Sequence, residues 1–137
     1  MSEPLSALMA ISSALGRFNK KMDRVLSVHG ISFTDFQVLE QLAQSPNQVM
    51  SRIELAEATN LTASGITRLL LPMEKVHLVE KEKNNRDARV SLVKLTTTGN
   101  EVYQNALVTS QNFSDNTMQY LTAKQVEQLR VLVGKLS

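Results

Sequence analysis

The side chains best suited to chemistry lie on one face of a predicted helix that begins near Thr62. Ile66, Leu69 and Leu70 recur with helical spacing and predict a buried apolar stripe. The other positions carry small or polar side chains: Thr62, Ala63, Ser64, Thr67 and Arg68. A helix face of small hydroxyl side chains and one arginine can approach base edges and phosphates closely. This face therefore indicates a helix that contacts DNA.

A second candidate group lies in the polar loop Asn84–Arg89, in which two arginines bracket Asp87. The flanking segments Leu78–Glu82 and Val90–Leu95 predict two strands, because they are enriched in β-branched residues and alternate partly between apolar and polar. A short extended segment is also expected at Gln48–Met50. The loop is then the basic tip of a hairpin. It is either a second contact to nucleic acid or a solvated tip with no binding role.

Residues that would support catalysis or metal binding are scarce. The chain has no cysteine, which excludes disulfides, thiol nucleophiles and cysteine-based redox sensing. Its two histidines, His29 and His77, stand far apart with no acidic cluster beside either, and such residues are more often structural than ligands. We therefore predict no catalytic residues, no metal site, no cofactor and no enzymatic activity.

The distribution of charge gives modest support to a nucleic-acid partner. Segment 51–95 holds eight of the 15 Lys and Arg residues and six of the 13 Asp and Glu residues, so it carries the whole net charge of +2. The rest of the chain is neutral, and a dimer would double the excess positive charge.

Length and composition limit the class of protein. With 137 residues, 42% of them hydrophobic, the chain is large enough for one domain with a substantial core. No apolar run is long enough to span a bilayer, and no basic-then-apolar leader opens the sequence. We expect a soluble, cytoplasmic protein without a membrane partner.

Three helix starts are predicted by the same local pattern. In a capping box, a Ser or Thr and a Gln or Glu three residues later bond to backbone N–H groups left unpaired at the helix start. The boxes are Thr34 with Gln37, Ser51 with Glu54, and Thr122 with Gln125. Each is flanked by an apolar pair placed as a hydrophobic staple: Phe33 with Val38, Met50 with Leu55, and Leu121 with Val126. These patterns predict helices over 35–44, 52–59 and 123–135.

The connection between Thr59 and Thr62 is too short for its two flanking helices to run antiparallel. Asn60 tolerates the left-handed backbone that a tight bend needs, so the spacing predicts a helix-turn-helix. Pro72 cannot donate to the carbonyl of Arg68, so we expect the second helix to kink or end near Leu71.

Long helices with apolar stripes are predicted at both ends of the chain. Apolar residues recur with helical spacing from Leu5 to His29, and Gly30 predicts the end of that helix. Thr96–Gly99 cap a helix over about 99–120, and the last helix places its apolar residues nearly all on one face. This much apolar surface at both ends of a small chain favours an intertwined dimer, with packing inside one subunit as the alternative.

The segment from Arg86 to Gly99 resembles the wing and following helix of the MarR family of bacterial transcription regulators. The motifs concerned are Arg86-Asp87-Ala88-Arg89-Val90 and Val93-Lys94-Leu95-Thr96-Thr97-Thr98-Gly99. Upstream, Leu55-Ala56-Glu57 and Thr62–Leu70 resemble the helix-turn-helix of that family, and Met73-Glu74-Lys75 resembles its Leu-Glu-Lys step. The motifs cover about 51–99, whereas the order of helices is similar over essentially the whole chain.

The resemblance implies a mainly α fold of the α+β class, a winged helix-turn-helix with long N- and C-terminal dimerisation helices. Residues 1–137 would form a single domain. The winged lobe would occupy 33–96, and the dimerisation helices 5–30 and 99–137. Two lobes of a homodimer would bind double-stranded DNA at a pseudo-palindromic operator.

The resemblance also implies roles for individual residues. By match to the motif, the residues that would enter the major groove are Thr62, Ala63, Ser64, Gly65, Thr67 and Arg68. Arg86 or Arg89 would reach the minor groove, with Asp87 orienting a guanidinium through a charge-assisted pair. Ser51 and Arg52, at a helix N-terminus, would hold a phosphate.

The sequence departs from the family in two places. The family usually has glycine where this chain has His77, so a residue with a side chain must make the bend before the first strand. Pro72 occurs in only part of the family. Neither change removes a residue expected to contact DNA.

These residues lead to the hypothesis of a ligand-responsive transcription regulator, either a repressor or an activator. The resemblance implies a pocket between lobe and dimer helices that often takes small aromatic acids, and no motif marks its residues here. A ligand that favours the wrong spacing of the lobes would shift the population away from DNA. The rival function is a winged-helix protein-interaction module without DNA binding.

Overall fold

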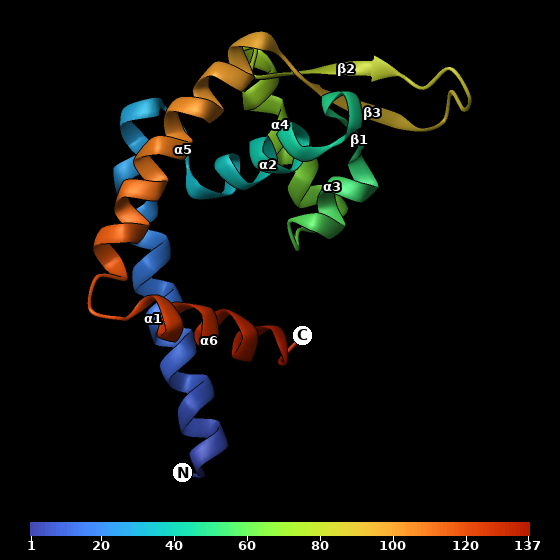
Figure 1. Cartoon of the computed structure of the whole chain (residues 1–137). Coiled ribbons are helices and arrows are strands. Elements are labelled where there is room, and N and C mark those ends of the chain that lie inside the picture. Colours follow the sequence, from blue (N-terminus) through green and yellow to red (C-terminus); the bar gives the residue numbers. More distant parts are fainter.

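Six α-helices and a small sheet make up the fold, and the computed structural model describes all 137 residues (Figure 1). The elements in chain order are α1 (Glu3–Leu26), η1 (Ser27–His29), α2 (Phe33–Gln44), η2 (Pro46–Gln48), β1 (Val49–Ser51), α3 (Arg52–Ala58), α4 (Ala63–Lys75), β2 (Val79–Lys83), β3 (Ser91–Leu95), α5 (Thr97–Thr117) and α6 (Ala123–Gly134). The short helices and the sheet form a lobe, while α1 and α5 run side by side away from it. The predicted mainly α winged helix-turn-helix is confirmed.

One apolar core holds the lobe together. Its fully buried side chains come from every helix of the lobe, from α1 and from two strands, and they include Leu26 of α1, Leu39 and Leu42 of α2, Leu55 of α3, Ile66 and Leu70 of α4, Val79 of β2 and Val93 of β3. Burial of each such side chain contributes about 1.5–3 kcal/mol. The core extends to α5 through Phe36 and Tyr103, whose rings stack with centroids 5.6 Å apart. The helix-turn-helix is therefore fixed to the long helices by packing.

The three strands are antiparallel and lie in the order β1-β3-β2. Val79 at the start of β2 faces Leu95, and Lys83 at its end faces Ser91. Only the base of this β2–β3 hairpin is buried, and its far half projects beyond the lobe as a wing (Figure 1). The predicted hairpin is confirmed.

The capping boxes of α3 and α6 are confirmed. In α3, the Ser51 hydroxyl accepts from the Glu54 N–H at 3.1 Å, and the Glu54 carboxylate accepts from the Ser51 N–H at 3.2 Å. Thr122 and Gln125 form the same pair of bonds at 3.1 and 2.9 Å. Both helices begin at the residues that the capping pattern predicted.

The predicted cap of α2 is wrong. The N-cap is Ser32, which forms a capping box with Asp35, so α2 begins at Phe33 rather than near residue 35. The earlier start is also stabilised from outside the helix, because the Asp23 carboxylate accepts from the Phe33 N–H at 2.8 Å. Thr34 therefore lies inside the first turn.

Of the two outcomes predicted at Pro72, a kink or an end, the end is wrong, since α4 continues to Lys75. Pro72 and Arg68 both lie on the exposed side of the helix, so water can hydrate the Arg68 carbonyl that the proline leaves without a helical partner. Buried Leu70 and Met73 anchor the helix on either side of the proline. The loss of one helical bond on a solvated face does not end a helix that is held by core contacts.

Besides Asn47 and Gln48 between α2 and β1, three bends use left-handed backbone conformations. Gly30 ends the first helical segment with a φ of 73°, and Asn60 makes the turn between α3 and α4 with a φ of 58°. His77 bends the chain before β2 with a φ of 62°. Bends at all three residues had been predicted. His77 adopts a left-handed conformation that glycine would adopt more easily.

The two ends of the chain expose apolar side chains. Helix α6 contains no buried residue, and α5 begins at Thr97, two residues earlier than predicted. The exposed apolar residues at these ends include Leu5, Leu8 and Met9 of α1, Leu129 and Leu132 of α6, and Leu136 after α6. Helix α6 contributes no residue to the core and lies away from the lobe (Figure 1).

Candidate nucleic-acid interface

Helix α4 presents the small, polar face that the sequence predicted. Thr62 is its N-cap, with the hydroxyl accepting from the Gly65 N–H at 3.0 Å. Thr62, Ala63, Ser64, Thr67 and Arg68 are exposed, whereas Ile66, Leu70 and Met73 face the core. Gly65 is half-buried, and a Cβ built there would lie 3.1 Å from the Thr62 hydroxyl oxygen. The helix N-terminus is thus narrow, rigidly capped and open to solvent.

The side chains of this face differ in how far they are already bonded within the chain. The Thr67 hydroxyl donates to the Ala63 carbonyl at 3.0 Å and accepts from Arg52 at 3.3 Å. The Ser64 hydroxyl lies 3.3 Å from that of Thr62. The Arg68 guanidinium has neither a hydrogen bond nor an ion pair inside the chain. Arg68 is therefore the side chain of α4 that is best placed to bind an outside group.

Ser51 and Arg52, at the start of α3, are engaged inside the molecule. Ser51 is buried and its hydroxyl is used in the capping box. The Arg52 guanidinium bonds to Ser91 of β3 at 3.1 Å and to Thr67 at 3.3 Å, and it forms an ion pair with Glu74 at 3.4 Å. The structure therefore joins Arg52 to α4, the candidate recognition helix, and to the wing.

The wing tip is shaped by side chains that accept from their own backbone. The Asn84 side-chain oxygen accepts from the N–H groups of Arg86 and Asp87, at 2.9 and 3.3 Å. The Asp87 carboxylate in turn accepts from the Arg89 N–H at 3.0 Å. Such turns are typical of Asn and Asp in loops. Asn84 was not among the predicted site residues, although an Asn at the start of a polar loop was a usable signal.

Asp87 and Arg89 also form an ion pair at the wing tip. The Arg89 Nε lies 3.1 Å from a carboxylate oxygen of Asp87, and 91% of the Arg89 side chain is exposed. The Arg89 side chain, and then its backbone N–H, lower the pKa of Asp87 below its ordinary value, while desolvation acts weakly in the opposite direction. Asp87 thus stays ionised and directs the guanidinium of Arg89. The Arg86 side chain has no partner in the chain.

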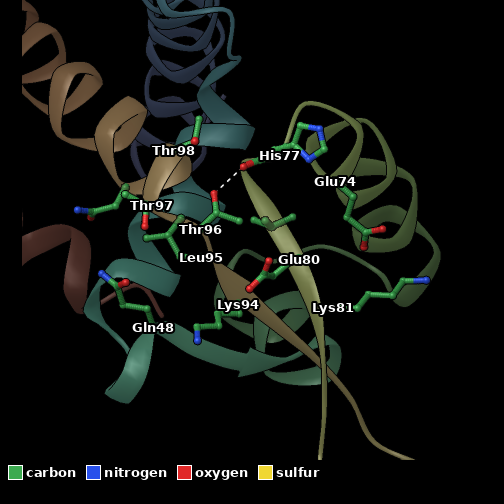
Figure 2. Close-up of a pocket in the computed structure, with 12 residues that line it drawn as sticks. Gln48, Glu74, His77, Glu80, Lys81, Lys94, Leu95, Thr96, Thr97 and Thr98 are labelled. Carbon is green, nitrogen blue, oxygen red and sulfur yellow. Dashed lines mark hydrogen bonds between the residues drawn. The ribbon is translucent and has the colours of Figure 1, made fainter.

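The base of the wing is fixed where α4, β2, β3 and α5 meet (Figure 2). The Thr96 hydroxyl donates to the carbonyls of His77 and Leu78 and accepts from the Gly99 N–H. An open and mostly polar hollow lies here, lined among others by Glu74, Lys81, Lys94 and Asn100. These contacts set the direction in which the wing leaves the lobe.

No group of three or more His, Cys, Asp or Glu side chains is placed to hold a metal ion. His29 bonds instead to a hydroxyl of α5, with its Nε2 2.6 Å from the Thr109 oxygen. None of the helices has both the length and the apolar content needed to cross a membrane.

The order of elements and the exposed face of α4 beside a hairpin define a winged helix-turn-helix protein. A model of the MarR family matches residues 29–90, which include the whole helix-turn-helix, β2 and the wing tip and end just before β3. The fold is similar to that of a cysteine-to-serine mutant of MarR from Escherichia coli complexed with operator DNA. That match has a TM-score of 0.81 and 26% identity, and it covers 98% of this chain and 99% of that one. In sequence over residues 29–90, and in fold over nearly the whole chain, the protein is similar to the MarR family of transcriptional regulators, as its motifs predicted.

Two relatives are similar to the chain in sequence. The HTH-type transcriptional regulator PrsX of Escherichia coli is 26% identical over 124 residues, which cover 88% of this chain and 75% of PrsX. The HTH-type transcriptional regulator YhbI of Bacillus subtilis is 26% identical over 131 residues, which cover 95% of this chain and 84% of YhbI. The similarity thus extends well beyond the helix-turn-helix into the long helices.

Proposed function

We propose that the chain is a sequence-specific DNA-binding regulator that acts as a homodimer on a pseudo-palindromic operator. The observation that carries the proposal is the exposed face of α4. Its side chains are small or polar, and its arginine, Arg68, has no partner inside the chain. Arg68 would bond to a base edge or a phosphate, and Ser64 and Ala63 would let the helix enter the major groove closely. The MarR mutant with a similar fold was crystallised with operator DNA, which supports the same partner here.

The wing would supply a second contact in the minor groove. Arg89 is almost fully exposed and is directed by Asp87, whereas Arg86 is unpaired and able to reorient. Arginine is attracted to the negative potential of a narrow minor groove. We assign groove insertion to Arg86, because its guanidinium has no internal bond to break, and an orienting role at the tip to the Asp87–Arg89 pair.

The dimer would be formed by the terminal helices. Helix α6 contains no fully buried residue, yet it carries Leu129 and Leu132, and Leu136 follows directly after it. The first turns of α1 expose Leu5, Leu8 and Met9 in the same way. Unpaired apolar surface at two helices supports pairing with a second copy, in which the two lobes must stand roughly 34–36 Å apart to reach successive major grooves.

A small effector would bind where the lobe joins the long helices. The hydroxyl of Ser110 on α5 is buried without a hydrogen-bond partner, and the adjacent Thr109 is bonded to His29. A ligand that bonds to Ser110 would stabilise one arrangement of lobe and helices over another. The expected ligand class is a small aromatic acid, and a titration of such acids against preformed operator complex tests this part of the proposal separately.

The central experiment is binding of the purified protein to the DNA upstream of its own gene, at two salt concentrations and with excess competitor DNA. A palindromic footprint that resists competitor and weakens steeply with salt would support the proposal, since each neutralised phosphate contributes about −0.9 to the slope of log K against log salt. Capture of a fixed set of genomic fragments would locate an operator elsewhere. If DNA binding does not depend on salt and no genomic fragment is enriched, the result would favour the rival function, a protein-interaction module.

A further inference from the structure

Arg52 connects the three parts of the lobe that would have to be aligned on DNA. From the start of α3, its Nε donates to the Ser91 hydroxyl of β3 at 3.1 Å. One terminal nitrogen donates to the Thr67 hydroxyl at 3.3 Å, and the other donates to the Glu74 carboxylate at 3.4 Å. The partners lie 15, 22 and 39 residues away in the sequence, on the recognition helix and on the wing.

The geometry of these bonds suits an arginine and no other cation. Three different nitrogens of one planar group point at three acceptors on two separate elements, which a single ammonium cannot reproduce. Only 20% of the Arg52 side chain is exposed, and the Glu74 side chain is as well covered, at 21%. The pair is therefore partly desolvated and better held than an ion pair on the open surface.

The same contacts leave little of Arg52 for a phosphate. The charge is balanced by Glu74, and a phosphate would have to displace that carboxylate or approach within its repulsion. The single O–H donor of Thr67 is likewise already used, because it donates to the Ala63 carbonyl, and one of its two lone pairs accepts from Arg52, so it has no proton left for a phosphate. Both side chains are thus bonded parts of the scaffold, although Thr67 lies on the exposed face of α4.

We propose that Arg52 is a positioning residue, which fixes the angle between the recognition helix and the wing and thereby sets sequence preference. Thr67 acts as its anchor on α4 instead of reading a base. This inference rests on the proposed DNA-binding function, and it replaces the phosphate contact that the position of Arg52 in the sequence had suggested.

The test compares Arg52→Ala, Arg52→Lys and Glu74→Gln by the salt dependence of DNA binding and by the preference for operator over unrelated DNA. If Arg52 positions the helix, all three variants lower that preference by roughly tenfold, the scale of one lost base contact, and leave the salt slope unchanged. If Arg52 binds a phosphate, Arg52→Ala lowers the slope by about 0.9 and weakens all sequences equally, whereas Arg52→Lys stays near the parent. That second pattern would overturn the proposal.

Glu74→Gln separates the two roles by the sign of its effect. Removing an acidic group that competes with phosphate for Arg52 should strengthen binding, whereas removing the anchor of a positioning arginine should weaken it. The matched control is Glu57→Gln on α3, an exposed carboxylate with no partner in the chain. It measures the effect of one less negative charge alone.

A measurement without DNA keeps this inference distinct from the proposed function. Hydrogen exchange of the free protein should become faster in β3 in Arg52→Ala and Glu74→Gln, while the amides of α2 keep their protection. Unchanged exchange of β3 in folded variants would refute the positioning role even if DNA binding were lost. Failure of the parent protein to bind any DNA would refute the proposed function and leave the exchange result standing.

Discussion

Gly99, the third residue of α5, lies very close to the backbone of Leu78, which directly precedes β2. No residue with a Cβ could take this position without a shift of that backbone. A Cβ built at this position would lie 2.0 Å from the Leu78 carbonyl oxygen and 2.8 Å from Cδ1 of Leu95. An ordinary contact between such atoms is about 3.5 Å, so in Gly99→Ala the Leu78 carbonyl would have to retreat by roughly 1.5 Å. The helix and the base of the wing cannot keep their present spacing after this substitution.

The expected cost follows from the bonds that this movement breaks. The Leu78 carbonyl accepts from the Thr96 N–H at 3.2 Å and from the Thr96 hydroxyl at 3.0 Å, and each bond contributes about 1 kcal/mol. Overpacking adds about 1–3 kcal/mol of strain, and the better helix propensity of alanine returns up to about 1 kcal/mol. We expect Gly99→Ala to lower the free energy of unfolding by about 2–4 kcal/mol. For a chain of this size the corresponding loss in Tm is roughly 6–12 °C.

Thermal unfolding followed by circular dichroism checks this value, with all variants at one protein concentration because dimerisation would make Tm depend on concentration. The matched control is Gly16→Ala in α1, where an added Cβ meets nothing within 4 Å. The same chemical change should there raise stability by up to about 1 kcal/mol. A Gly99→Ala protein that melts at or above the parent temperature would show that the contact with Leu78 yields freely, and the reasoning would be refuted.

Three further predictions concern binding, charge and assembly. Arg68→Ala should weaken operator binding by about 1–3 kcal/mol and relax sequence preference in fluorescence anisotropy; a folded dimer with parental affinity would remove Arg68 from the interface. The pKa of Asp87 should lie below its ordinary value of 3.8, so its pairing with Arg89 persists above that pH and is lost as pH falls through the lower value. Carboxyl NMR should detect this, and in Arg89→Ala the pKa should rise toward 3.8. Leu132→Lys should raise the dimer dissociation constant at least about tenfold in sedimentation equilibrium, since burial of a leucine contributes about 1.5–3 kcal/mol. Unchanged dimerisation of a folded Leu132→Lys protein would exclude this face of α6 from the interface.

Local patterns in the sequence were sufficient for most helix starts and turns. The boxes at Ser51 and Thr122 and the left-handed turn at Asn60 depend on residues no more than three positions apart, so the sequence contains all of the information. The cap of α2 was misplaced because two overlapping patterns compete there. A bond from Asp23, ten residues upstream, adds to the Ser32 box and is invisible in a local pattern.

Pro72 shows a different limit of the same reasoning. The rule that proline ends a helix assumes that the lost hydrogen bond decides the outcome. Here the unpaired carbonyl belongs to an exposed residue, and Met73 directly after the proline is buried in the core. Tertiary packing therefore outweighs the local preference, and the extent of that packing could be known only once the fold was described.

The two arginines of the helix-turn-helix, Arg52 and Arg68, show that some sequence signals predict a binding role better than others. Arg68 was assigned from helical periodicity, which tells which side of a helix faces the core, and its side chain is indeed exposed and unpaired. The phosphate contact of Arg52 was assigned from its place at a helix N-terminus. That place depends on the local backbone only, and it does not reveal hydrogen-bond acceptors on other elements. Glu74 and Ser91 reach Arg52 only because α4 folds back on α3 and because β1 and β3 pair with Ser51 opposite Leu92. A basic residue beside a strand pairing is thus the kind of position at which a scaffold role competes with a contact to DNA, and the sign of the Glu74→Gln effect decides between them.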